Sequence, residues 1–111
     1  IRKAIADTEH NTGLVVTVAF DYGSRAELVR ATQRAMAAGV VTKDSLTQNM
    51  YDPSMPAVDL LVRTSGESRI SNFMLWQITG SKVFFTERTW PDFDAAELDL
   101  ALAAYSTGVS S

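Results

Sequence analysis

The sequence predicts an α/β fold with a mainly parallel sheet flanked by helices. Residues 14–20 and 58–62 are short runs rich in Val and Leu, and such runs are typical of strands that are covered on both faces. A helical pattern and a turn-rich stretch separate the two runs. A strand, helix, strand order is by default a right-handed crossover between parallel strands.

Composition indicates one globular domain, and we therefore predict a single domain over residues 1–111. Of the 111 residues, 46% are hydrophobic and 21% are charged. The net charge of −3 and the pI of about 5.0 argue against a nucleic-acid partner. Because the chain has no cysteine, a disulfide framework and a thiolate zinc site are both excluded. No apolar run approaches the ~20 residues that span a bilayer.

The first elements are a helix end and a strand. Residues 1 to about 10 have a helical pattern, and residues 11–13, Asn-Thr-Gly, are typical of a helix C-terminus. The run at 14–20 then predicts the first strand. The chain starts within this helical pattern and without an initiator Met, so we expect that upstream sequence has been lost.

Two helices should follow. Ser24 and Glu27 have the spacing of a capping box, in which Ser24 bonds the N3 amide and Glu27 reaches back to the Ser24 amide. The helix that starts there is expected to end at Gly39, a residue suited to the left-handed position after a helix. Thr42 is predicted to cap a short helix that runs through Met50.

The second half begins with a turn-rich connection at 51–56, where two prolines disfavour helix, and continues into the strand at 58–62. After the polar loop at 63–71, residues 72–77 are short and amphipathic, and residues 83–85 are predicted to form a short strand. Asp94-Ala-Ala-Glu97 is predicted to cap a final helix.

The loop after the second strand concentrates polar side chains. Arg63, Gly66, Glu67, Arg69 and Ser71 occur within nine positions. Ligands in open α/β sheets bind at the carboxyl ends of strands, and two arginines offer forked donors that match phosphate oxygens. If a helix begins near Ser71, its free amides would add anion affinity. The alternative is that the arginines form ordinary surface ion pairs worth about 0–1 kcal/mol each, and spacing alone leaves both interpretations open.

The stretch from Asp59 to Gln77, followed by Trp90-Pro-Asp-Phe93, resembles the signature of the cis-prenyltransferases, which include the undecaprenyl diphosphate and Z-isoprenyl diphosphate synthases. Tyr22-Gly-Ser-Arg25 is similar to the family's Tyr-Gly-Gly-Arg segment. The resemblance implies the C-terminal part of the cis-prenyltransferase fold. Residues 1–111 would then be the C-terminal portion of such an enzyme, and the N-terminal half with its Asp-Gly-Asn-x-Arg motif is absent.

The resemblance also implies a function. The complete enzyme would condense isopentenyl diphosphate with an allylic diphosphate to make a Z-polyprenyl diphosphate, with Mg²⁺ as cofactor. Carried over by position, Arg63, Arg69 and Ser71 would bind the isopentenyl diphosphate head group, with Ile70 and Glu67 also in the substrate site. Glu67 is interpreted as an orienting partner of the arginines. We expect no catalytic residue and no metal ligand in this chain.

Three further positions depart from the family's pattern. Counting forward from Gln77 puts Lys82 where the family has a metal-binding Glu, and an ammonium cannot ligate Mg²⁺. The alternative is that Lys82 merely starts the strand at 83–85, with its ammonium in solvent. Ser68 occupies the position of a histidine in the family's loop. Residues 105–111 replace the family's basic C-terminal tail.

The resemblance implies partners as well. We expect isopentenyl diphosphate and an allylic diphosphate as ligands, and a homodimer or a cis-prenyltransferase partner chain as the assembly. A cytoplasmic location, peripheral at the inner face of the plasma membrane through the lipid product, is the corresponding expectation. The isolated chain is expected to be inactive. The alternatives are a non-catalytic partner subunit and a degenerate paralogue that acts through protein–protein contact.

Overall fold

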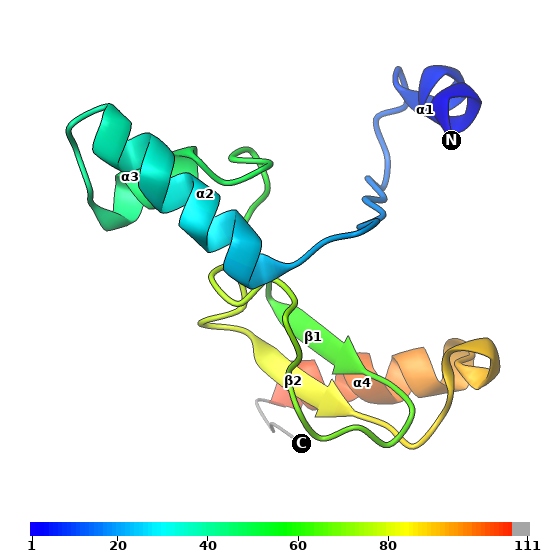
Figure 1. Cartoon of the computed structure of the whole chain (residues 1–111). Helices are drawn as coiled ribbons and strands as arrows, with labels where there is room; N and C mark the ends of the chain where they lie inside the picture. The colour runs from blue at the N-terminus through cyan, green and yellow to red at the C-terminus, as the bar shows by residue number, and fades with distance from the viewer. Residues whose placement is uncertain (108–111) are drawn as a thin grey trace.

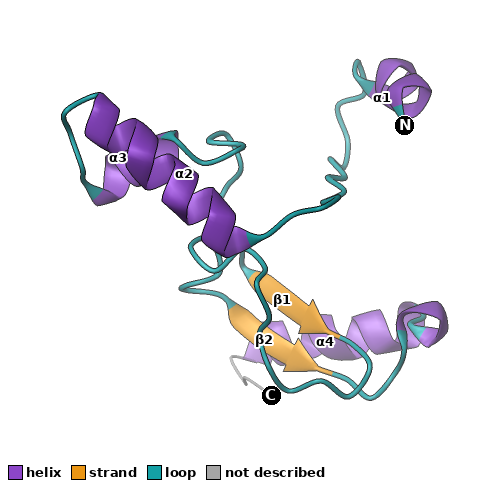
Figure 2. Ribbon diagram, viewed as in Figure 1, coloured by secondary structure: helices purple, strands orange, loops and turns teal. Residues whose placement is uncertain are grey.

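The computed structural model describes residues 1–107 and shows two groups of elements joined at one junction, with the first helix set apart (Figure 1). One group pairs α2 with α3, and the other consists of two strands and α4 (Figure 2). The elements are α1 (Arg2–Thr8), α2 (Ser24–Ala37), α3 (Lys43–Gln48), β1 (Leu60–Arg63), β2 (Lys82–Phe85), the 3₁₀-helix η1 (Trp90–Asp92) and α4 (Ala95–Thr107).

The sheet confirms the predicted α/β class. Strands β1 and β2 pair in parallel, with Leu60 opposite Lys82 and Arg63 opposite Phe85. Helix α4 contacts β2 and lies against one face of this pair (Figure 2). Because the strands are parallel, both of their carboxyl ends lie at the same edge of the sheet, where β1 ends at Arg63.

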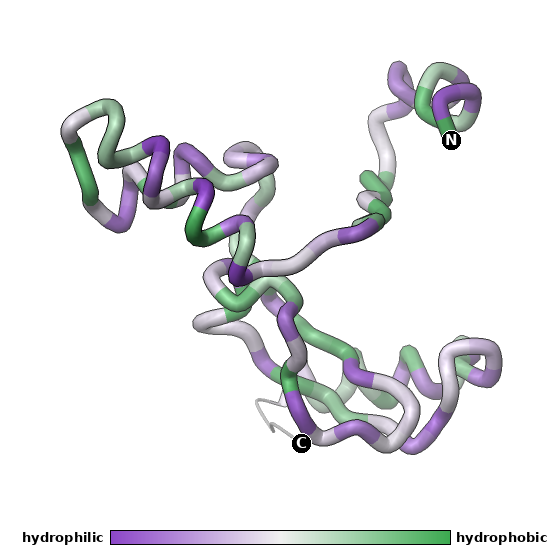
Figure 3. The backbone as a smooth tube through the Cα atoms, in the orientation of Figure 1, coloured by the Kyte–Doolittle hydropathy of each residue, from purple (hydrophilic) through white to green (hydrophobic). Residues whose placement is uncertain are grey.

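The strand predicted over residues 14–20 is wrong. These residues form an irregular connection between α1 and α2, and no strand within residues 1–107 pairs with them. Apolar side chains remain exposed along it, with Leu14 93% and Val16 75% exposed. Figure 3 colours part of this connection green, for hydrophobic residues. A strand needs a neighbour for its backbone N–H and C=O groups, so suitable composition alone does not form one. The parallel pair therefore lies between 60–63 and 82–85.

The predicted capping box at Ser24 is also wrong. Ser24 is the first residue of α2, and Gly23 precedes it as the N-cap without a side-chain bond. The helix does end as expected, because Gly39 follows it with a left-handed φ of +83°. Ala31 and Ala35 are fully buried on α2.

The two remaining caps are confirmed. Thr42 Oγ1 accepts from the Ser45 amide at 3.0 Å, and Ser45 Oγ accepts in return from the Thr42 amide at 2.8 Å. The Glu97 amide donates to Asp94 Oδ1 at 3.0 Å before α4. Within residues 1–107, none of the helices combines the length and apolar character needed to cross a membrane.

Candidate diphosphate-binding loop

The loop that follows β1 is fastened to the chain after β2. The Ser65 amide donates to the Arg88 carbonyl at 2.7 Å, and the Gly66 amide donates to the Thr86 carbonyl at 2.9 Å. Ser65 and Gly66 both have left-handed φ angles, +67° and +69°. A Cβ on Gly66 would lie 2.7 Å from Glu87 Oε2, so a larger residue would have to displace the Glu87 side chain and would also be strained by the positive φ.

Arg63 lines a cavity. Its Nη2 lies 3.5 Å from Ser71 Oγ, and its Nε is buried with no hydrogen-bond partner among the described residues. A buried N–H without an acceptor is costly and uncommon in folded proteins, and a bound anion would satisfy it. The cavity has a volume of about 270 Å³ and is lined by Leu61, Val62, Arg63, Ile70, Ser71 and Phe73.

Glu67 and Arg69 are not among the residues that line this cavity, and they pair with each other. Arg69 Nε donates to Glu67 Oε2 at 3.1 Å; the Arg69 side chain is largely solvent-exposed, and that of Glu67 is half-buried. The structure therefore brings together Arg63, Ile70 and Ser71, while Glu67 orients Arg69 alone. Because Arg69 is exposed, the pair contributes little to stability, and Arg69 can leave Glu67 for a better acceptor at little cost.

The helix start expected near Ser71 is not present. Residues 72–74 form bends and residues 75–77 form turns, and the Phe73 amide donates to the Ser71 carbonyl at 2.9 Å. No helix therefore begins at Ser71 to offer free amides to an anion in the cavity. Ser68 is exposed in the loop, and the expected change of the C-terminal tail falls partly on residues 108–111, outside the described residues.

Lys82 begins β2, in agreement with the interpretation that it starts this strand. Its ammonium is not free in solvent, however, but bonded to Tyr105. The Nζ atom donates to the Tyr105 carbonyl at 2.6 Å and lies 4.8 Å from the centre of the Tyr105 ring. Lys82 is at the amino end of its strand, whereas the loop at 63–71 follows the carboxyl end of β1. The position predicted for a metal ligand thus contacts α4.

The side chains of the described region do not fit a magnesium site by themselves. Within residues 1–107, no group of three or more His, Cys, Asp or Glu side chains lies close enough together to hold a metal ion. Mg²⁺ requires near-octahedral oxygen coordination, usually from carboxylates, phosphates and water. The carboxylates that flank the loop, Glu67 and Glu87, point to Arg69 and Gly66 instead.

A buried carboxylate lies next to a second cavity. Glu27 is 2% exposed and accepts from Tyr22 Oη at 2.5 Å, the Tyr51 amide at 2.9 Å and Gln77 Nε2 at 3.3 Å. Burial, and then the hydrogen bond to Glu27, raise the pKa of Tyr22. The cavity has a volume of about 470 Å³, and Phe73 lines both cavities.

The capping-box interpretation had hidden this role of Glu27. One signal in the sequence could have revealed it: Glu27, Ala31 and Ala35 recur every four residues, which places the carboxylate on the buried face of α2. A buried carboxylate then requires hydrogen-bond donors from other segments.

Comparisons with known proteins agree on one family. A family model described as undecaprenyl diphosphate synthase matches residues 1–109. An isoprenyl transferase of Neisseria gonorrhoeae is 43% identical over 107 residues, which cover 95% of this chain and 43% of the relative. An isoprenyl transferase of Ralstonia nicotianae is 47% identical over 112 residues, with the same coverage of both chains.

Two solved structures are similar as well. A probable undecaprenyl diphosphate synthase from Campylobacter jejuni superposes with a TM-score of 0.81 at 30% identity, covering 95% of this chain and 50% of the other. Lavandulyl diphosphate synthase from Lavandula x intermedia, in complex with dimethylallyl diphosphate, gives a TM-score of 0.79 at 32% identity, covering 95% and 49%. The chain therefore spans about half the length of the proteins that it matches.

Proposed function

The chain belongs to the undecaprenyl diphosphate synthase family, and on that premise we propose that its 63–71 loop holds the diphosphate of isopentenyl diphosphate. The complete enzyme would join this substrate to an allylic diphosphate and make a Z-polyprenyl diphosphate. One observation carries the proposal: Arg63, at the carboxyl end of β1, has a buried Nε with no protein acceptor, beside a cavity shared with Ile70 and Ser71.

The roles of the five predicted residues follow from their contacts. Arg63 supplies a charged, forked donor to the diphosphate, and the Ser71 hydroxyl adds a neutral one. Ile70 provides an apolar wall. Glu67 holds the Arg69 guanidinium in an ion pair until the anion replaces the carboxylate. This arrangement positions the substrate and neutralises its charge, which are the main requirements of a transfer between diphosphates.

We assign the rest of the chemistry to groups outside this chain. The proposed cofactor of the complete enzyme is Mg²⁺, which would neutralise diphosphate charge, and its ligands would come from a part of the enzyme that corresponds to the relatives' remaining length. We infer that this chain is the C-terminal portion of such an enzyme. A homodimer or a cis-prenyltransferase partner chain, peripheral at a membrane surface, is the proposed assembly.

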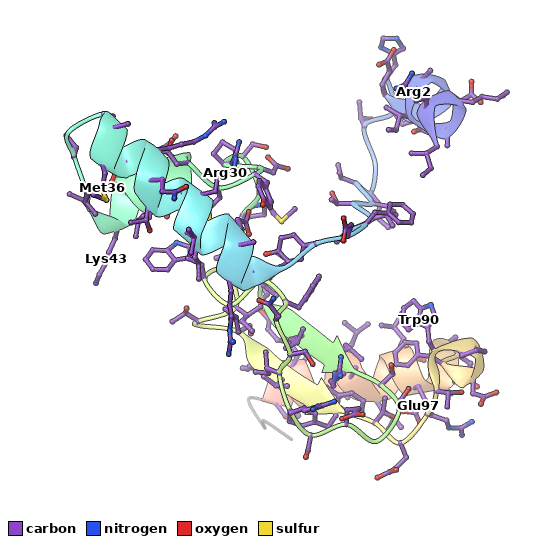
Figure 4. The ribbon with its side chains drawn as sticks, in the orientation of Figure 1. Arg2, Arg30, Met36, Lys43, Trp90 and Glu97 are labelled. Carbon is purple, nitrogen blue, oxygen red and sulfur yellow. The ribbon has the colours of Figure 1, made fainter. Side chains whose placement is uncertain are left out.

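Isothermal titration of the 111-residue chain with inorganic diphosphate and with isopentenyl diphosphate tests the loop. Arg63→Ala is expected to weaken binding about tenfold or more, because a hydrogen bond to a charged group is worth about 1.5–3 kcal/mol. Arg69→Ala should have a smaller effect, since this side chain is exposed. The matched control is Arg2→Ala, on α1 and remote from the loop (Figure 4). Unchanged affinity in Arg63→Ala would contradict the proposal.

A non-catalytic partner subunit is the second candidate, together with a degenerate paralogue that has the same contact role. The engagement of Lys82 with Tyr105, at the position matched to a metal-binding Glu, favours both. Mixing the chain with an active member of the family distinguishes them from the first candidate. A partner subunit would raise the activity of the mixture, and Arg63→Ala in this chain would change that activity little.

A further inference from the structure

We propose that Asn72 is a positioning residue for residues 63–71, here called the diphosphate loop, because it connects the end of this loop to the N-terminus of α2. The inference rests on the proposed function of the loop. Asn72 directly follows Ser71, but it is not among the residues that line the cavity at Arg63. Its effect on a bound diphosphate would therefore be indirect, through the place that it gives to Ser71.

Asn72 supplies two acceptors to the first turn of α2. Its side-chain Oδ1 accepts from the Arg25 amide at 2.7 Å, and its carbonyl accepts from the Ser24 amide at 3.1 Å. The first amides of a helix have no acceptor within the helix, and here a residue 47 positions away provides it. The side chain that caps α2 thus comes from the end of the diphosphate loop.

A third bond runs in the opposite direction. Ser24 is fully buried, and its Oγ accepts from the Leu75 amide at 2.9 Å. Met74 lies between Asn72 and Leu75 and has a φ of +46°, a left-handed conformation that is uncommon for residues other than glycine. Such a conformation persists when its neighbours are fixed on both sides, as Asn72 and Leu75 are here.

Gly23 makes the contact sterically possible. A Cβ at this position would lie 2.9 Å from Asn72 Nδ2, closer than side-chain carbon atoms approach other heavy atoms. Glycine before α2 therefore lets Asn72 reach the helix. We call these residues, Gly23, Ser24, Arg25, Asn72 and Leu75, the Asn72 joint.

The joint gives the loop its second anchor. The first anchor holds Ser65 and Gly66 on the chain after β2, and the second holds Asn72 on α2. Arg63 is fixed at the end of β1, and Ser71 directly precedes the second anchor; the Arg63 guanidinium and the Ser71 hydroxyl lie 3.5 Å apart, close enough to share one anion. A loop with one anchor would have to be ordered by the ligand, and that ordering costs affinity.

The test titrates inorganic diphosphate into Asn72→Ala, Ser24→Ala and Arg63→Ala, with Asn11→Ala as the matched control on the exposed connection. Asn72→Ala is expected to weaken binding at least about fivefold while the chain stays folded, because a misplaced binding group loses much of its effect. Hydrogen exchange should show faster exchange at the amides of residues 24, 25 and 75. Asn72→Asp keeps the acceptor and should restore slow exchange at residue 25.

The outcomes separate the two proposals. If Arg63→Ala abolishes binding and Asn72→Ala remains within twofold of the unaltered chain, Asn72 is not a positioning residue. If Arg63→Ala leaves binding unchanged, the proposed function of the loop fails, whatever the exchange data show. Should Asn72→Ala not fold, Ser24→Ala is judged by the same fivefold and twofold limits, because it removes the third bond and leaves the loop sequence intact.

Discussion

At the scale of single residues, Glu27 joins three segments that are distant in the sequence. Its carboxylate receives hydrogen bonds from Tyr22 before α2, from the backbone at Tyr51 and from Gln77 after the diphosphate loop. No Lys or Arg forms an ion pair with it among the described residues. The Glu27 carboxylate is therefore stabilised by hydrogen-bond donors and not by a cation. Because Tyr22 is one of these donors, the network depends on the proton of the Tyr22 hydroxyl.

We expect folding stability to decrease at high pH through Tyr22. Its pKa in the folded chain is raised above the ordinary value of 10.0 by burial and by Glu27, so the folded state holds the phenolic proton more tightly. The stability that Tyr22 contributes is fully present below the pKa of Tyr22 in the unfolded chain. It is lost as the pH rises through the higher pKa of Tyr22 in the folded chain. Urea unfolding at a pH of about 8 and of about 11 measures the loss.

The matched control is Tyr22→Phe, which lacks the titrating hydroxyl but keeps the ring against Tyr51 and Phe73. This variant is expected to lose less stability between the two pH values, since the Tyr22 hydroxyl is the only group by which the two proteins differ. A decrease of the same size in both proteins would show that Tyr22 does not contribute to the pH dependence.

At the scale of elements, α4 contacts the residues after β2 that hold the diphosphate loop in place. Glu97 Oε2 accepts from the Thr86 hydroxyl at 2.9 Å, and Glu97 Oε1 lies 3.5 Å from Arg88 Nε. Thr86 and Arg88 are the same residues whose carbonyls hold Gly66 and Ser65. Figure 4 shows Glu97 on α4 at this edge of the molecule. The helix thus supports the first anchor of the loop.

Glu97→Ala is therefore predicted to lower the free energy of unfolding by about 1–3 kcal/mol, because the buried Thr86 hydroxyl loses its acceptor. Glu97→Gln keeps an acceptor for Thr86 and should lose less. Asp99→Ala, an exposed change on the same helix, is the control and should remain within about 0.5 kcal/mol. Chemical denaturation measures all three, and equal losses in Glu97→Ala and Asp99→Ala would contradict the prediction.

Local patterns predicted the elements whose reasons are local. Thr42, Asp94 and Gly39 act at helix ends as their residue types indicate, because a cap depends on a few neighbouring residues. The strand at 14–20 and the Ser24 capping box failed for the opposite reason. Strand pairing and the true acceptor of the α2 amides, Asn72, both depend on segments far away in the sequence.

Some features of the candidate site could likewise be predicted from the sequence, and others could not. Its residue types and its position after a strand could be read from the sequence, since both follow from composition and order. The sequence could not show that Arg63 shares a cavity with Ile70 and Ser71 while Glu67 takes Arg69. Nor could it show that Lys82 contacts Tyr105, because that contact depends on where α4 packs.

At the scale of the whole molecule, the connection before α2 leaves apolar side chains in solvent. Leu14, Val15, Val16, Val18 and Phe20 are all exposed, and the last part of the connection lines the larger cavity. Several apolar side chains exposed along one segment are typical of a surface that contacts another protein segment, a membrane or a ligand. This exposure agrees with a chain that spans about half the length of its relatives.

We accordingly predict that the pure chain makes no prenyl product. The candidate loop is proposed to hold only one of the two diphosphates, and within residues 1–107 no three His, Cys, Asp or Glu side chains cluster to hold a metal ion. Incubation with labelled isopentenyl diphosphate, farnesyl diphosphate and Mg²⁺, followed by separation of extended lipids, measures this directly. A complete family enzyme is the positive control. Any elongated product from the chain alone would contradict the assignment of the missing groups to another part of the enzyme.

The Asn72 joint also bears on the order in which the chain folds. The α2 and α3 pair forms from contacts between near neighbours, and α4 follows β2 after a short connection. The joint must instead close a loop of 47 residues, a slow step because chain entropy is lost before the contact forms. Refolding should therefore produce two separately ordered halves first, and the capacity to bind diphosphate should arise last.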